Sequence, residues 1–265
     1  CTKCFHGQLD IALDPNIVYD DSYTHRSSES PISKSGNDFF ASKIKQFNSI
    51  NKKTKLLEIG CNDAYLLKKL SNDINFGFGI DPIWKSKKPG KYKNFKILGG
   101  FAEEAHKVLP REFEPNVVIS AHTFEHTINL YSDLKGLVDL ADNNCIFHIE
   151  MPSLDTLIRL KRFDQIFHQH IQYISESSIV ALTNRLNTTL LDISYNYSYW
   201  GGTVIFTFQK KNIPEKNFEH MDLSIEKINK SFNEFKVLIE LLKNQINFYD
   251  SYCYLGAAQM LPIID

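Results

Sequence analysis

The chain has 265 residues, of which 43% are hydrophobic, which is enough for one large core or for one core and a smaller satellite domain. Its 30 Lys and Arg residues nearly balance its 31 Asp and Glu residues, and a net charge of −1 argues against a general nucleic-acid binder. No apolar run approaches the roughly eighteen residues of a membrane span, and no signal-peptide pattern is present. We therefore expect a cytoplasmic protein without nucleic-acid or membrane partners.

The five cysteines are odd in number, and only Cys1 and Cys4 are close together, as expected in a reducing compartment. The CTKC spacing of Cys1 and Cys4 matches half of a structural zinc site, in which two thiolates from one turn hold the metal. The other two ligands lie upstream of residue 1, or are His6 or His25, or the site does not exist. Because the chain starts without methionine and ends just after an apolar run, we expect both ends to be cut from a longer protein.

The first part of the chain is polar and the middle alternates. The stretch 24–37, THRSSESPISKSGN, predicts a loop or lid, and the helical spacing of apolar residues begins at 39–47. Buried strands then alternate with amphipathic helices, which is typical of a doubly wound parallel sheet. The expected strands are 55–60, 76–80, 95–98, 116–120 and 145–150, and the expected helices are 64–70, 101–109 and 130–141.

The last third departs from this alternation. A helix from about Ser178 precedes two β-rich runs, 188–195 and 203–208, and a long helix covers about 221–248. The final YCYLGAAQMLPI predicts a strand turning into a helix, the start of a further α/β unit. We therefore expect an α/β fold in three parts: the end of a zinc module with a lid or linker, a central sheet domain, and a long helix leading into a C-terminal domain. Their bounds are 1–38, 39–210 and 211–265.

The first strand ends in LEIGCNDAY, a glycine-bearing turn where backbone N–H groups can approach a ligand. A dinucleotide fingerprint requires glycine at positions 60, 62 and 65, whereas this chain has Gly60, Asn62 and Tyr65. The missing second glycine, which would let a pyrophosphate come close, disfavours a nicotinamide or flavin cofactor.

The E-x-G-x-N-D form instead resembles motif I of class I S-adenosylmethionine (SAM)-dependent methyltransferases. In that class the first acidic residue, here Glu58, helps hold the loop and the methionine ammonium. The turn, here Gly60, Asn62 and Asp63, cradles the aminoacyl part of SAM. About twenty residues later the second strand ends in GID, which places Asp81 where a carboxylate accepts both ribose hydroxyls.

Two further segments continue this pattern. GGFAEEA offers Phe101 and Ala102 as an apolar patch for adenine, and SAHTFEH carries Ala121 and His122 beyond the carboxyl end of the fourth strand, where ligands bind in open α/β sheets. Individually, Asp81 could be a helix N-cap and Phe101 a core residue. Their order along the chain favours a SAM site.

The stretch FDQIFHQHIQYIS, residues 163–175, combines two histidines with amides, an aspartate and a tyrosine among large apolar side chains. With the CxxC start, EIGCND, GIDP, IEMP, WGG and GAA, it makes almost the whole chain resemble the bacterial nucleotide-sugar C-methyltransferases. That family joins a small N-terminal zinc module, a SAM domain and a C-terminal domain that helps hold the nucleotide sugar. The resemblance implies a role in surface-glycan or secondary-metabolite synthesis.

In that family the stretch typically reads FDTIYHEH, and its second histidine is the proposed base. By position, the resemblance makes His170 the base and His168 its neighbour, with Gln169 between them. A neutral imidazole is a suitable acceptor for a proton beside a ketone. The alternative is that both histidines are hydrogen-bonded core residues.

This chain departs from the family pattern at several positions. The family's tyrosine is Phe167 and its glutamate is Gln169, so a hydroxyl and a carboxylate are lost. The family's polar segment has become WGGTVI, which makes Tyr173 and the WGG residues candidate walls of a sugar or nucleotide pocket: Trp200, Gly201 and Gly202. Without the enolate-stabilising hydroxyl, O-methylation of a sugar becomes as reasonable as carbon methylation. Two other interpretations stay open, an O-methyltransferase for another small-molecule hydroxyl and a binding protein that has lost catalysis.

Overall fold

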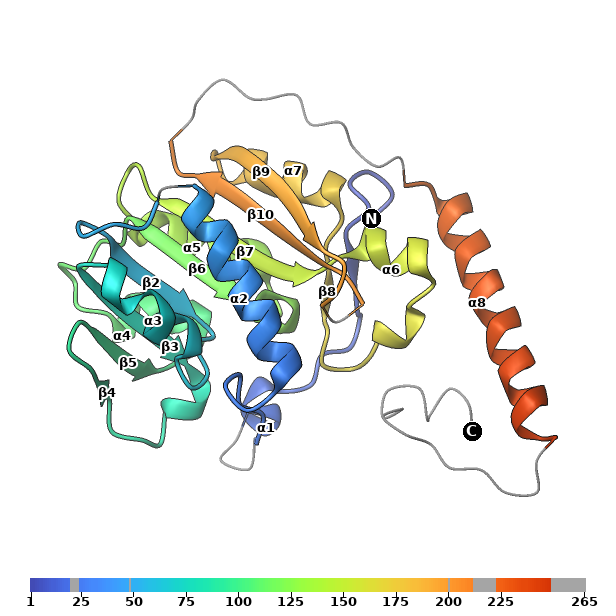
Figure 1. Ribbon diagram of the computed structural model, residues 1–265. Coiled ribbons are helices and arrows are strands. Elements are labelled where there is room, and N and C mark those ends of the chain that lie inside the picture. Colours follow the sequence, from blue (N-terminus) through green and yellow to red (C-terminus); the bar gives the residue numbers. More distant parts are fainter. Residues whose placement is uncertain (20–23, 48, 200, 212–222, 249–265) are drawn as a thin grey trace.

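The computed structural model describes residues 1–19, 24–47, 49–199, 201–211 and 223–248. In this part of the chain an eight-stranded sheet forms the centre of the molecule (Figure 1). Its strands, in spatial order, are β4 (Gly90–Lys91), β5 (Phe95–Gly99), β3 (Phe76–Asp81), β2 (Lys55–Ile59), β6 (Val117–Ala121), β7 (Ile146–Pro152), β10 (Thr203–Gln209) and β9 (Thr189–Asn196).

The five strands from β5 to β7 are parallel to one another, while β4 and β10 run antiparallel to their neighbours. The predicted α/β fold with a mostly parallel sheet is confirmed. The two β-rich runs of the last third belong to the same sheet, because β10 inserts between β7 and β9.

Helices cover both faces of the sheet. One face packs against α2 (Pro31–Gln46) and α3 (Tyr65–Leu70), and the other against α4 (Ala105–Val108), α5 (Leu130–Leu140) and α7 (Glu176–Arg185). Successive strand residues serve opposite faces, since side chains alternate along a strand. Thus Leu56 packs in the cluster of α2 and α3, whereas Leu57 packs in the cluster of α4, α5 and α7.

Smaller elements surround this core. The short strand β1 (Gly7–Gln8) pairs antiparallel with β8 (Gln172–Tyr173), so the N-terminal residues are bound to the FDQIFHQHIQYIS stretch. Helix α8 (Ile225–Ile246) packs on α6 (Leu154–Leu160) through a separate apolar cluster and lies away from the sheet (Figure 1). The remaining elements are α1 (Pro15–Val18) and the 3₁₀ turns η1 (Ser71–Asp73), η2 (Pro82–Trp84), η3 (Ala102–Glu104), η4 (Phe124–His126) and η5 (Phe163–Gln165).

Helix α2 begins earlier than the sequence pattern indicated. The prediction of a loop through residue 37 is wrong for 31–37, because the helix starts at Pro31. The Ser30 side chain accepts a hydrogen bond from the Ser33 N–H, and proline at the first helical position lacks an N–H that would need a partner. The first two turns are polar in sequence, which concealed the start. The predicted strand and helix at the C-terminal end lie outside the described residues.

The order of the strands creates a crevice. From β2 the chain proceeds to β3 and β5 on one side, and then crosses back to β6 and β7 on the other. The carboxyl ends of β2 and β6 therefore lie side by side where the direction of winding reverses, which is the usual ligand position in open α/β sheets. None of the helices in the described ranges is long and apolar enough to cross a membrane.

We expect Ser30→Ala to destabilise the protein by about 1 kcal/mol, because the first turn of α2 loses its cap. Urea denaturation of the two proteins would measure the difference in unfolding free energy. Ser42→Ala, at an exposed position of the same helix, serves as the control and should not destabilise. Equal losses in both variants would contradict the capping role of Ser30.

Candidate functional site

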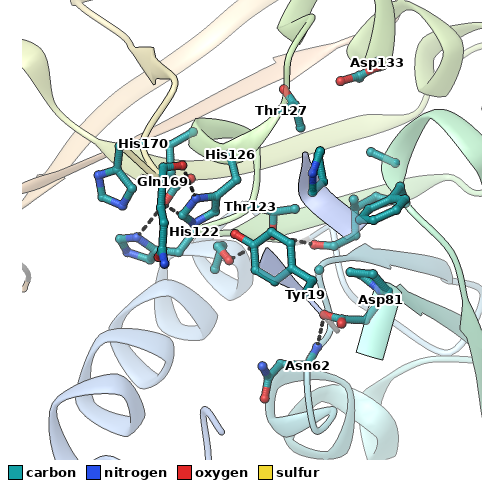
Figure 2. A pocket seen from close by; sticks show the side chains of 18 of the residues that line it. Tyr19, Asn62, Asp81, His122, Thr123, His126, Thr127, Asp133, Gln169 and His170 are labelled. Carbon is teal, nitrogen blue, oxygen red and sulfur yellow. Dashed lines mark hydrogen bonds and ion pairs between the residues drawn. The ribbon is translucent and has the colours of Figure 1, made fainter. Parts of the chain in front are cut away.

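A cavity of about 600 Å³ opens over the carboxyl ends of β2, β3 and β6. Figure 2 shows that one end carries Asn62 and Asp81, while the other end gathers His122, His126 and His170. Most of the residues that the sequence assigned to SAM line this cavity, namely Gly60, Asn62, Asp81, Phe101, Ala102, Ala121 and His122. Gln169 and His170 line it as well, so one cavity contains both candidate half-sites.

The turn after β2 passes very close to the loop after β6. Gly60 has φ +73°, and a Cβ at this position would lie 1.8 Å from the Thr123 Oγ1 atom. Only glycine can therefore occupy this position without a rearrangement. Asn62 and Ala64 also have left-handed φ values of 49° and 63°, and asparagine adopts this conformation more readily than most residues. The turn therefore reaches the cavity, which Gly60 and Asn62 line, at the cost of local strain.

Asp81 is both a cap and a wall of the cavity. Its Oδ2 accepts a hydrogen bond from the Asn62 N–H at 2.8 Å, and its Oδ1 accepts one from the Ile83 N–H at 3.0 Å. Burial raises the pKa of this carboxyl, although the two N–H donors oppose the rise. Each oxygen retains lone-pair capacity for a further hydrogen bond, as contact with a ribose diol would require.

Two residues assigned to the cofactor stand behind the cavity wall. Glu58 is buried, and its Oε2 accepts a hydrogen bond from the Leu67 N–H in the first turn of α3 at 3.1 Å. Asp63 accepts one from the Ser28 N–H at 3.1 Å, which joins the segment before α2 to the turn. Neither residue lines the cavity, and both instead hold neighbouring backbone in position.

The part of the cavity around Phe101 contains polar residues that the sequence did not single out. Phe101 lies under the Lys85 ammonium, which is 3.9 Å from the ring centroid. Thr127 and Asp133 also line the cavity, and burial followed by the charge of Glu103 raises the pKa of Asp133 to about 6. Asp133 lies on the first turn of α5, where the pattern of apolar residues gave no signal.

At the other end, three histidines surround the carboxylate of Glu125, which has no exposed surface. Its Oε1 lies 3.0 Å from His122 Nδ1 and 3.8 Å from His126 Nε2. One donor or acceptor atom from each of Glu125, His126 and His170 lies within 4.8 Å of the others. Figure 2 shows the three imidazoles gathered at this end of the cavity.

Hydrogen bonds between the segment 169–172 and the turn η4 bring His170 to this cluster. The Ile171 N–H donates to the Glu125 carbonyl at 2.7 Å, and the Gln172 side chain donates to the Thr127 carbonyl at 2.9 Å. The His126 Nδ1–H donates a hydrogen bond to the Gln169 carbonyl at 2.7 Å, and His126 Nε2 lies 3.8 Å from Glu125 Oε1.

The pKa values of the groups in this cluster are shifted in different directions. Burial alone would raise the pKa of Glu125, but the hydrogen bond from His122 and the neighbouring imidazoles lower it to about 2. Burial alone would lower the pKa of His122, but Glu125 and Glu150 outweigh burial and raise it above 6.5. For His170 burial prevails and lowers the pKa to about 3.

The remaining candidates lie away from the cavity. His168 is exposed, and Tyr173 is buried, with its hydroxyl accepting a hydrogen bond from the Phe167 N–H at 3.2 Å. Gly201 and Gly202 have φ values of +79° and +113°, and they shape the turn before β10 without lining the cavity. Trp200 lies outside the described residues.

Within the described ranges, Cys1 and Cys4 belong to no group of three or more potential metal ligands. Cys1 is exposed, and the backbone carbonyl of Cys4 accepts a hydrogen bond from the Ser175 hydroxyl at 3.2 Å. The group whose spacing would admit a cation is the one around Glu125. Because that carboxylate is already paired with His122, we interpret the group as an acid–base cluster.

The strand order and the cavity define a class I SAM-dependent methyltransferase fold. Solved structures share it: magnesium protoporphyrin IX methyltransferase from Synechocystis PCC 6803 with bound S-adenosylhomocysteine (SAH) matches with a TM-score of 0.52 and 12% identity, over 74% of this chain and 92% of that one. The N-methyltransferase NodS from Bradyrhizobium japonicum matches with a TM-score of 0.50 and 12% identity, over 69% of this chain and 99% of that one.

Among curated proteins, the C-methyltransferase NovU from Streptomyces niveus is 28% identical over 111 residues. The match covers 42% of this chain and 26% of that protein's length. No family model matches the chain. These neighbours are all methyltransferases, and the fold is therefore established at the level of the class.

We expect Asp81→Ala to weaken SAH binding roughly tenfold or more, because hydrogen bonds to a charged group contribute about 1.5–3 kcal/mol. Isothermal titration calorimetry with SAH would measure the change. Asp73→Ala is a matched control, because Asp73 is half-exposed and pairs only with Lys45 in the described structure. An SAH affinity that is unchanged in the Asp81 variant would contradict the placement of the ribose.

Proposed function

We propose that the protein transfers a methyl group from SAM to a nucleotide-linked sugar, at a carbon beside a ketone or at a sugar hydroxyl. The observation that carries the proposal is the single cavity that joins the Asp81 end to the histidine cluster around Glu125. A cofactor held by its ribose at Asp81 would extend toward the ends of β2 and β6, and the acceptor would lie among the histidines. When bound, SAM supplies an electrophilic methyl group.

The acceptor class rests on sequence similarity. The FDQIFHQHIQYIS stretch and the surrounding motifs resemble the nucleotide-sugar C-methyltransferases, and the curated relative NovU is a C-methyltransferase. The C-terminal domain that helps hold the nucleotide sugar in that family is expected to begin within 211–265, of which the structure describes residues 211 and 223–248. The proposal therefore names the acceptor only as a nucleotide-linked sugar, without specifying the nucleotide or the sugar.

His170 is our candidate for the general base. Its Nδ1 is buried and has no hydrogen-bond partner among the described residues, and its ring lies 4.2 Å from the Phe167 ring, measured between centroids. Because its pKa is lowered to about 3, the imidazole is unprotonated at neutral pH and can accept a proton. The same low pKa makes it a weak base, so the acidity of the acceptor must be raised by another group.

A specific observation favours sugar O-methylation as the second candidate. Phe167 occupies the position of the family's tyrosine, so no hydroxyl from this residue can stabilise an enolate. Removal of a proton from a sugar hydroxyl forms no enolate, and one base would be sufficient.

We expect His170→Asn to lower turnover by about 10²–10⁴-fold while SAH affinity changes little, since a positioned acid–base group contributes this much. Turnover with labelled SAM and a panel of nucleotide sugars, and calorimetry with SAH, would separate the two effects. His168→Asn is the matched control, because His168 is exposed outside the cavity and its loss should reduce turnover far less. Wild-type turnover in the His170 variant would mean that this histidine is a core residue.

We retain the CTKC segment as a proposed zinc half-site. Two thiolates fill only half of a tetrahedral site, so the 265-residue chain alone should hold zinc weakly and substoichiometrically. Metal analysis after dialysis, with the Cys1→Ser and Cys4→Ser double variant for comparison, would test this. Stoichiometric zinc that is lost in the double variant would instead point to His6 or His25 as further ligands.

A further inference from the structure

Carbon methylation beside a ketone needs two groups, a base for the α-proton and a donor for the oxygen that becomes negative. Phe167 cannot donate, and Gln169 carries no charge. We propose that His122, held by Glu125, is the catalytic donor that stabilises the acceptor's enolate oxygen in this protein. The inference rests on the proposed function and specifies its acceptor as an enolisable keto sugar.

The position of His122 suits this task. It is the first residue after β6 and lines the cavity at the point where β2 and β6 lie side by side. Its Nδ1 donates to Glu125 Oε1 at 3.0 Å, and its Nε2 is buried with no hydrogen-bond partner among the described residues. A buried nitrogen in this state costs free energy unless a ligand pairs with it. The Tyr199 ring packs edge-on at 4.8 Å and restricts the imidazole.

The surrounding charges favour the protonated ring. Two carboxyl groups face His122: Glu125 from η4, and Glu150 from β7, whose own pKa burial raises to about 7. The other titratable neighbours are the Tyr199 ring and the imidazoles of His25, His170 and His126, the last sharing Glu125. The pKa of His122 is raised above 6.5, whereas that of His170 is lowered. Two groups of one type whose environments shift their pKa values apart are suited to opposite roles as acid and base.

The bond between the α-carbon and its proton breaks, the proton joins His170 Nδ1, and the electron pair forms the enolate. His122 Nε2–H donates a hydrogen bond to the enolate oxygen without giving up its proton. When the α-carbon takes the methyl group, the bond between that methyl and the sulfur of bound SAM would break, SAH would be the leaving group, and the carbonyl would reform. Glu125 touches neither reactant and acts as a positioning residue that keeps His122 protonated.

The backbone at His122 suggests the best replacement. Its φ of 51° lies in the left-handed region, which asparagine tolerates better than most residues. His122→Asn should therefore fold, and Glu125→Gln preserves the shape of the positioning side chain. His106→Asn, on the exposed side of α4, is a matched control.

The test uses the thymidine diphosphate 4-keto-6-deoxy sugar in D₂O with SAH present, so that enolisation is followed by NMR as deuterium exchange beside the ketone. We expect His122→Asn to slow this exchange at least about 10²-fold at saturating SAH, and Glu125→Gln to slow it less. The protonated His122 is present below its raised pKa and lost above it, so wild-type exchange should decline on the alkaline side of 6.5, and this decline should disappear in His122→Asn. His106→Asn should behave as wild type.

A second measurement does not depend on activity. NMR titration of the histidine Cε1–H signals, with His122→Asn identifying the resonance, should give a raised pKa that Glu125→Gln lowers. Unchanged exchange in His122→Asn, absence of exchange in wild type, or an unshifted His122 would overturn the inference. Failure of the wild-type protein to bind SAH would instead overturn the proposed function.

Discussion

The site depends on the attachment of residues 169–172 to the turn η4 after strand β6. The Glu125 carbonyl accepts the Ile171 N–H, and the Gln169 carbonyl accepts from His126. These short backbone contacts place His170 beside residues more than forty positions earlier in the chain. Because β1 pairs with β8 immediately afterwards, the N-terminal segment is bound to the same structure. Without this attachment the cavity would keep its Asp81 end but would lack His170 and Gln169 at the other end.

The Asp81 end of the cavity follows from the adjacency of β2 and β6. The strand turns approach so closely that glycine is required at Gly60, and the strained residues Asn62 and His122 follow the carboxyl ends of these two strands. Left-handed backbone at non-glycine residues costs free energy and persists where the surroundings fix it, often at functional sites. Here the turn directs the Asn62 N–H to the Asp81 carboxylate on one side, and the left-handed residue His122 places its imidazole at the cavity on the other.

Sequence reasoning identified the sheet because alternating apolar residues must bury both faces. It proposed Asp81 and Gly60 for the cofactor because their positions at strand ends carry geometric meaning, and both line the cavity. It did not identify Glu125, which reads as one polar residue in a loop; only the three-dimensional attachment of residues 169–172 surrounds it with histidines. For Glu58 the resemblance implied that it holds both the loop and the methionine ammonium, and the structure turns its carboxylate inward to the first turn of α3. The direction of a side chain at a strand end depends on packing that a pattern does not encode.

The position of Glu125 bears on how the departures from the family pattern at Phe167 and Gln169 are interpreted. Read along the sequence, Phe167 and Gln169 remove a hydroxyl and a carboxylate and suggest that catalysis has been lost. In the folded structure the Glu125 carboxylate is fully buried, and a buried charge is destabilising unless it is paired. It is paired with His122, which can replace the missing donor, while the neutral His170 keeps its accepting nitrogen. The functional groups needed for enolate chemistry are thus present on different residues, and this arrangement argues for an active enzyme over a lapsed one.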